Sequence, residues 1–187
     1  LGIILCWIPA VIIASVQGEL GRAEALVCAL ELERLARAKK GDTRLGTWPF
    51  TIGLWVGKGA TPNKMGSEKN YDPTTARMKV NAYQQASDRN PSPVPIEKCP
   101  WCDRKFAPTS SRLTPNPARP QNLEVYCTNR DCPFSGDMAL PMLTVDEPLY
   151  RRLPCFLIAT VDKFAQLPWV GRTGALCAGV MLTISPS

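Results

Sequence analysis

The sequence predicts an α/β domain with a parallel sheet, interrupted by a small insert that is built around four cysteines. Apolar runs typical of strands alternate with helical segments in the order strand, helix, strand, insert, strand, helix, and this order is typical of parallel sheets. Four of the eight cysteines lie as two close pairs between residues 99 and 132. At 187 residues, the chain is long enough for one domain that carries such an insert.

The N-terminal stretch is apolar and is expected to supply the first strand. Residues 1–18 contain no charged residue, and AVIIAS, residues 10–15, is the expected core of this strand. The apolar part ends at Ala14 and is interrupted by Pro9, so it is shorter than the ~20 residues that a membrane-spanning helix needs. A secretory signal would begin with a basic segment, which this sequence lacks, although truncation would also remove one. No membrane association is expected.

Residues 19–40 have the strongest helical periodicity in the chain. One apolar stripe is expected to pack against the sheet: Leu20, Ala23, Val27 and Leu30, with Leu26 beside it. Glu33 and Arg37 lie one turn apart in the favoured order, and Gly41 follows two lysines, which is typical of a helix end.

The remaining elements follow in the expected order. Residues 49–57 alternate with the period of a strand, and residues 72–86 begin with Asp72 and Pro73, typical of a helix N-cap and first turn. Residues 153–161 form another apolar run, after which Thr160 or Asp162 is expected to cap a helix. The proline-rich segment 90–98 indicates a boundary. We therefore expect residues 1–96 and 139–187 to form the sheet domain and residues 97–138 to form the insert.

The spacing of the cysteines in the insert predicts a zinc site. Two residues separate Cys99 from Cys102, four separate Cys127 from Cys132, and 24 lie between the pairs. Each short pair lets one tight turn offer two sulfurs, and four thiolates match the tetrahedral preference of Zn²⁺. Because this set leaves no open coordination position, the ion is expected to be structural.

Two alternatives for these cysteines stay open. A secreted protein would pair them as disulfides, and an iron–sulfur cluster also takes four thiolates. The other cysteines are solitary residues among apolar neighbours, which is typical of reduced, buried thiols: Cys6, Cys28, Cys155 and Cys177. This pattern favours a metal over disulfides.

Composition restricts the possible chemistry. The chain has no histidine, which excludes Ser-His-Asp and Cys-His catalysis and histidine-ligated metals. A net charge of +6 and a pI of about 9.0 would suit nucleic acid. The insert, however, has six basic and five acidic residues, and four thiolates with one Zn²⁺ bring its net charge to about −1. A scaffold or protein contact is therefore favoured for the insert, where Trp101 and Phe106 either stack on bases or pack on the metal site.

The segment MLTVDEPLY, residues 142–150, resembles a Walker B strand that ends in Asp146 and Glu147. Pro148 follows at once, however, and Asp-Glu-Pro is also typical of the start of a helix. The chain has no Gly-x4-Gly-Lys-Ser/Thr segment that would hold the phosphates served by such a carboxylate. The structural interpretation is therefore favoured.

Several segments together resemble a known family: GRAEALVCALELERL, PFTIGLWVGKGATPN, CPWC with CTNRDCPF, LYRRLP and ATVDKFAQLPW. In this order they resemble the superfamily 2 helicase-like proteins of bacteria, notably the helicase component of DISARM-type anti-phage systems. The likeness covers about residues 19–176. It implies a partial RecA-like domain with an inserted zinc ribbon, taken from a cytoplasmic motor that moves on nucleic acid, namely DNA, and works with other defence subunits.

The resemblance also implies contacts to the nucleic-acid backbone through hydroxyls, amides and helix N-termini. The implied residues are Ser15, Gln17, Gly57, Gly59, Thr160, Asp162 and Lys163. The family's Walker A segment and acidic box are both missing from the chain. ATP and Mg²⁺ are therefore expected to bind only the complete parent protein, and this chain alone is not expected to hydrolyse ATP.

We expect the chain to be an interior piece of a longer protein, since it starts at Leu1 and lacks both nucleotide motifs. The alternative is a stand-alone zinc-ribbon scaffold that binds a protein partner. A secreted, disulfide-bonded domain is the third class.

Overall fold

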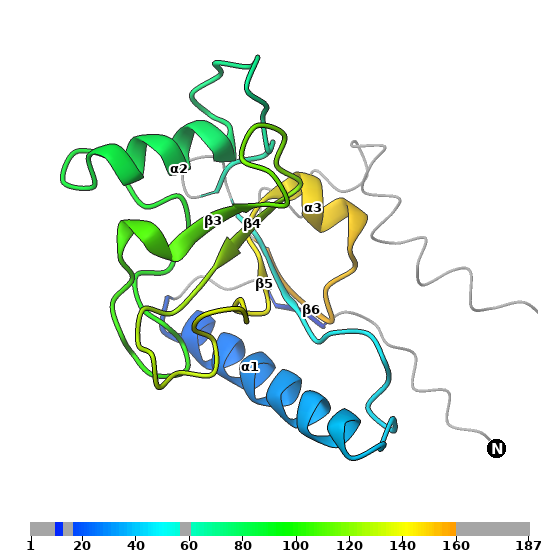
Figure 1. Ribbon diagram of the computed structural model, residues 1–187. Coiled ribbons are helices and arrows are strands. Elements are labelled where there is room, and N and C mark those ends of the chain that lie inside the picture. Colours follow the sequence, from blue (N-terminus) through cyan, green and yellow to red (C-terminus); the bar gives the residue numbers. More distant parts are fainter. Residues whose placement is uncertain (1–9, 13–16, 57–60, 160–187) are drawn as a thin grey trace, which may run out of the picture.

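A computed structural model describes residues 10–12, 17–56 and 61–159. Its centre is a four-stranded sheet in the order β1-β6-β2-β5 (Figure 1). The strands are β1 (Ala10–Ile12), β6 (Phe156–Ala159), β2 (Ile52–Trp55) and β5 (Met142–Leu143). All three strand pairs are parallel, which confirms the predicted parallel sheet.

Strand β2 is buried on both faces, as is typical of parallel sheets. Ile52 and Leu54 face a large core that includes Val27 of α1, whereas Trp55 faces a smaller one with Leu149 of α3. The sequence showed only the alternation that starts at Phe50. The second buried face follows from the helices that cover both sides of the sheet.

Helix α1 spans Gln17–Lys39, close to the predicted limits. Part of the predicted stripe is confirmed, because Val27 is buried and Ala23 packs against the core. Leu26 and Leu30 are 57% and 37% exposed, whereas Glu24, Glu31 and Arg34 are buried. The expected stripe was therefore wrong for these two leucines. The reason is that charged residues share the buried face with Val27 and Cys28, and a count of apolar residues places charged ones in solvent.

The buried charges on α1 are paired. Arg34 donates two hydrogen bonds to the Glu31 carboxylate, at 2.6 and 2.8 Å. The same carboxylate accepts the Phe50 amide at 2.9 Å. Because Phe50 lies just before β2, this pair fastens the middle of α1 to the start of the central strand.

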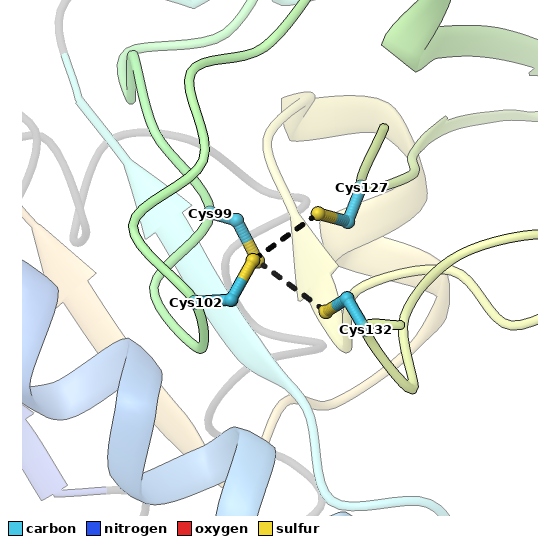
Figure 2. Close-up of side chains that lie close together, drawn as sticks. All are labelled: Cys99, Cys102, Cys127 and Cys132. Carbon is cyan, nitrogen blue, oxygen red and sulfur yellow. Dashed lines mark hydrogen bonds between the residues drawn. The ribbon is translucent and has the colours of Figure 1, made fainter. Parts of the chain in front are cut away.

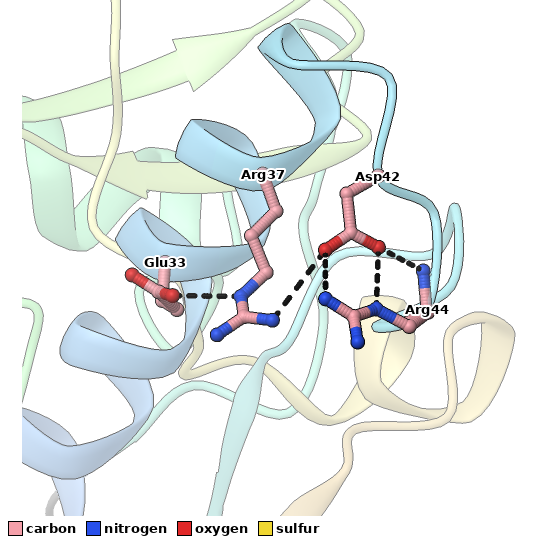
Figure 3. Close-up of polar contacts among 4 residues, drawn as sticks. All are labelled: Glu33, Arg37, Asp42 and Arg44. Carbon is pink, nitrogen blue, oxygen red and sulfur yellow. Dashed lines mark hydrogen bonds and ion pairs between the residues drawn. The ribbon is translucent and has the colours of Figure 1, made fainter.

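The C-terminal end of α1 agrees with the sequence. Gly41 has a φ of 77°, and the Asp42 and Gly41 amides donate to the carbonyls of Arg37 and Ala38, which is the Schellman arrangement. The predicted Glu33–Arg37 pair is present at 2.7 Å. Arg37 and Arg44 both contact Asp42 (Figure 3), and hydrogen bonds from Arg44 lower the Asp42 pKa to about 2.

Helix α2 (Ala76–Gln85) begins later than predicted. Asp72 is not its N-cap, because the Asp72 carboxylate accepts the Thr74 amide and hydroxyl in a turn that precedes the helix. The Ala76 amide instead donates to the Lys64 carbonyl at 2.9 Å. The preceding segment therefore supplies a main-chain acceptor at the start of α2.

The segment between α2 and β5 forms a separate antiparallel hairpin. It consists of the 3-10 turn η1 (Pro108–Ser110), β3 (Ser111–Thr114) and β4 (Asn122–Val125). The Leu140 amide donates to the Val125 carbonyl and leads the chain back toward β5. Helix α3 (Asp146–Arg151) then connects β5 to β6. The hairpin, the cysteine cluster and one face of the sheet share the same buried core.

Candidate metal centre

The first cysteine pair lies in a tight hairpin. Lys98 and Lys105 form an antiparallel bridge, and the Cys99 amide donates to the Arg104 carbonyl at 2.9 Å. Asp103 has a φ of 58°, a conformation that aspartate tolerates better than most residues. This turn allows Cys99 and Cys102 to point in the same direction.

The second pair closes a loop after β4. The Cys127 amide donates to the Phe134 carbonyl at 2.7 Å, and the Cys132 amide donates to the Asn129 carbonyl at 3.0 Å. The Asn129 amide also donates to the Cys127 sulfur at 3.4 Å. This bond ties the Cys127 side chain to the loop that leads to Cys132.

The two loops bring all four sulfurs within 4.8 Å of one another (Figure 2). The Sγ atoms of Cys99 and Cys132 are 3.9 Å apart, and those of Cys102 and Cys127 are 3.4 Å apart. Four sulfurs at about 2.3 Å from one tetrahedral Zn²⁺ lie about 3.8 Å from each other. The donor set and its spacing thus fit one ion, as the sequence predicted.

The alternatives fit this spacing less well. The six cysteines within the described ranges are free, and separations of 3.4 and 3.9 Å are far beyond the ~2.05 Å of a disulfide. In a four-iron cluster each thiolate binds a different iron, which places the sulfurs farther apart than around one ion. A single ion therefore matches the site better.

Burial and main-chain amides act in opposite directions on these thiols. Burial raises the pKa of Cys132 to about 11 and also raises that of Cys99. Burial also opposes ionisation of Cys102, but the Arg104 amide and the Cys127 thiol outweigh it and lower the Cys102 pKa to about 7. A cation is needed to hold all four groups as thiolates in this buried position.

The aromatic residues near the site pack around it. Trp101 meets the fully buried ring of Phe134 edge to face, with centroids 6.1 Å apart, and Phe106 packs against the core. These contacts favour the packing interpretation for both aromatic residues, although 43% of Trp101 stays exposed.

The acidic pair that resembles a Walker B strand starts α3, in agreement with the structural interpretation. The Glu147 carboxylate accepts the Met65 amide at 2.9 Å, and the Glu147 amide donates to the Asn63 carbonyl at 3.2 Å. Glu147 therefore fastens the segment that follows residues 57–60.

Most residues that the resemblance assigned to nucleic acid lie outside the described ranges: Ser15, Gly57, Gly59, Thr160, Asp162 and Lys163. Gln17 is the first residue of α1. The strands before these residues lie side by side. Ile12 is in register with Ile158, and Leu54 is in register with the same residue from the other side. The carboxyl ends of β1, β6 and β2 therefore share one edge of the sheet.

No sequence pattern predicted the groove between α2 and β3, which is lined by Val80, Asn81, Gln84 and residues of β3. It also missed Glu24, whose carboxyl group is buried. Neither helical periodicity nor cysteine spacing carries information on how α2 meets the hairpin.

Comparison with known proteins supplies one informative match. No family model matches the chain. The DISARM protein DrmA of Bacillus paralicheniformis (strain ATCC 9945a / NCIMB 11709 / CD-2) is 34% identical to it over 136 residues, which is 70% of this chain. The chain is related to a DISARM protein.

The match covers only a small part of DrmA. The chain spans 11% of the length of this curated relative. A function of the whole DrmA protein can therefore be assigned to this chain only as a proposal. Within residues 10–12, 17–56 and 61–159, no helix combines the length and the apolar character needed to cross a bilayer.

Proposed function

We propose that the chain is an interior part of a superfamily 2 nucleic-acid motor of a DISARM-type anti-phage system. In this proposal, residues 1–96 and 139–187 belong to a RecA-like domain, and residues 97–138 form its zinc-ribbon insert. ATP and Mg²⁺ bind the complete parent protein in the cytoplasm, and other defence subunits are its partners. Support comes from the similarity to DrmA and from the parallel sheet.

One observation carries the nucleic-acid part of the proposal. The carboxyl ends of β1, β6 and β2 lie at one edge, and open parallel sheets bind ligands at that edge. Ser15, Gly57, Thr160 and Lys163 follow these three ends in the sequence. Their hydroxyl, amide and ammonium groups suit the sugar–phosphate backbone of DNA and do not distinguish bases.

Binding of the zinc-loaded chain to single-stranded DNA at two salt concentrations tests this proposal. Thr160→Ala and Lys163→Ala are expected to weaken binding, and Lys163→Ala is expected to lower the salt slope by about one unit or less. The matched controls are Arg104→Ala and Lys105→Ala, which remove cations from the exposed turn of the metal centre.

The pattern of losses decides between two functions. If the Thr160 and Lys163 variants bind like the parent while the Arg104 and Lys105 variants lose binding, the ribbon is the binding surface. The proposal that the sheet edge binds DNA would then be wrong. If the parent itself does not bind DNA, the stand-alone zinc-ribbon scaffold becomes the better description.

A further inference from the structure

A groove of about 550 Å³ lies between α2 and β3, away from the metal centre. Its volume is within the ~300–1,000 Å³ that is usual for ligand sites. Helix α2 supplies Val80, Asn81 and Gln84 as one wall, and β3 supplies the opposite wall. Figure 1 shows α2 running beside η1 and β3.

The β3 wall of this groove is the outer edge of the hairpin. The Tyr126 amide donates to the Ser110 carbonyl at 2.8 Å. Antiparallel strands exchange hydrogen bonds at every second pair, so Ser111 and Leu113 direct their main-chain groups away from β4. The Ser111 carbonyl accepts the Gln84 side chain at 2.9 Å. By the same alternation, the Leu113 N–H and C=O point away from β4.

The groove also has an unpaired hydroxyl and a basic rim. The Thr114 Oγ1 atom is buried without a hydrogen-bond partner in the described part of the chain. No acidic residue is among those that line the groove. Arg112 also lines it, but its guanidinium lies 4.2 Å from the centroid of the Tyr126 ring and donates to the Gly136 carbonyl at 3.2 Å. Arg77 lies at the Pro117 end, where its Nε donates to the Pro117 carbonyl at 3.0 Å. The terminal nitrogens of Arg77 remain available to a carboxylate.

We propose that this groove binds an extended, acidic peptide segment of a partner protein, which adds as a third strand to the outer edge of β3. One peptide residue exchanges two main-chain hydrogen bonds with Leu113. An apolar peptide side chain packs on Val80 and Pro108, and a carboxylate pairs with Arg77. Main-chain pairing supplies affinity in this mode of recognition, and the side-chain pockets supply specificity.

A peptide fits the groove better than a nucleic acid does. An unpaired strand edge offers one donor and one acceptor at the spacing of another strand, which a sugar–phosphate backbone does not match. The proposal uses a different surface from the sheet edge, so it stands or fails independently of the proposed function.

Two peptide probes and one nucleic-acid probe test the inference on the zinc-loaded full chain. The peptides alternate valine with glutamate or valine with lysine, and the nucleic acid is oligothymidylate. Fluorescence anisotropy is expected to show that the glutamate peptide binds about tenfold tighter than the lysine peptide. Amide hydrogen exchange by NMR is expected to slow at Leu113 when the glutamate peptide binds.

Matched variants on α2 locate the site. Asn81→Trp fills the groove and is expected to weaken peptide binding about tenfold or more. Gln85→Trp places the same ring on the exposed end of α2, outside the lining residues, and is expected to bind like the parent. Arg77→Glu is expected to remove the preference for the glutamate peptide. Zinc content equal to that of the parent checks the fold of each variant.

Several results would overturn the inference. These are the absence of binding by the glutamate peptide, equal affinity for both peptides, and parental affinity in both Asn81→Trp and Arg77→Glu. Slowed exchange at Leu113 with oligothymidylate instead of peptide would assign the groove to nucleic acid and would equally overturn it.

Discussion

At the scale of single residues, Glu24 has the least usual environment in the described part of the chain. It is 2% exposed on the inner face of α1, and its Oε1 atom has no hydrogen-bond partner among the described residues. Burial raises the Glu24 pKa to about 8, and the Glu24 charge in turn contributes to the raised pKa of Cys28. A carboxyl group in such a position is held in its neutral form at neutral pH.

Glu24→Gln is therefore expected to change how stability depends on pH. Between about pH 4.5 and 8 the folded state keeps a proton that the unfolded chain has lost, so the stability of the parent falls as pH rises through this range. The variant lacks this penalty and is expected to be more stable by roughly 3–5 kcal/mol at pH 8. Urea unfolding of both proteins between pH 6 and 8.5 measures this difference in stability. Zinc binding contributes equally to the stability of both proteins, so its contribution drops out of the difference. A difference that stays constant with pH would contradict the assignment.

At the scale of elements, the contact between β2 and α3 depends on a glycine. A Cβ atom on Gly53 would lie 2.8 Å from Pro154 Cγ and 3.0 Å from Leu149 Cδ1. Gly53→Ala is expected to destabilise the fold by about 1–3 kcal/mol because these atoms must move. Gly21→Ala in α1 is the control, since nothing lies within 4 Å of its Cβ position. Urea unfolding compares them, and equal stability of the two variants would contradict the packing described for β2.

The cysteine loops form the second element with a direct test. We expect about one Zn²⁺ per chain by elemental analysis, and a large loss of zinc in Cys99→Ser. Cys28→Ser is the matched control, because Cys28 is also a buried thiol close to Cys99 but lies outside the four-sulfur cluster. Cys99, Cys127 and Cys132 share the core of Ile52 and Ile158, so the loss of zinc is expected to destabilise the sheet as well as the insert. Full zinc content in Cys99→Ser would contradict the site.

At the scale of the whole molecule, the absence of a phosphate-binding loop predicts that these 187 residues do not hydrolyse ATP, with or without DNA. The acidic pair at the start of α3 does not replace it, because Glu147 binds the Met65 amide. Phosphate release above background is the measurement. Turnover that disappears in Asp146→Asn would show that this segment serves nucleotide chemistry after all.

The sequence was sufficient for the features that depend on local chemistry. The order in which strand-like runs alternate with helical segments indicated the parallel sheet. Paired cysteines indicated the metal centre, and Gly41 indicated the end of α1. The sequence was insufficient where distant segments decide the outcome. The face of α1 depends on Glu31 meeting the Phe50 amide, and the start of α2 depends on the Lys64 carbonyl. The groove beside β3 arises only when α2 docks on the hairpin.

The strand order has a consequence for the way this chain is made. β6, the last described strand, lies between β1 and β2, so β1 has no neighbour among the described strands until residues 156–159 have left the ribosome. Before that point, β2 can pair only with the two residues of β5. Translation that stops between α3 and β6 would leave most of the apolar strand surface uncovered. The nascent chain is therefore expected to need protection by chaperones until β6 is synthesised.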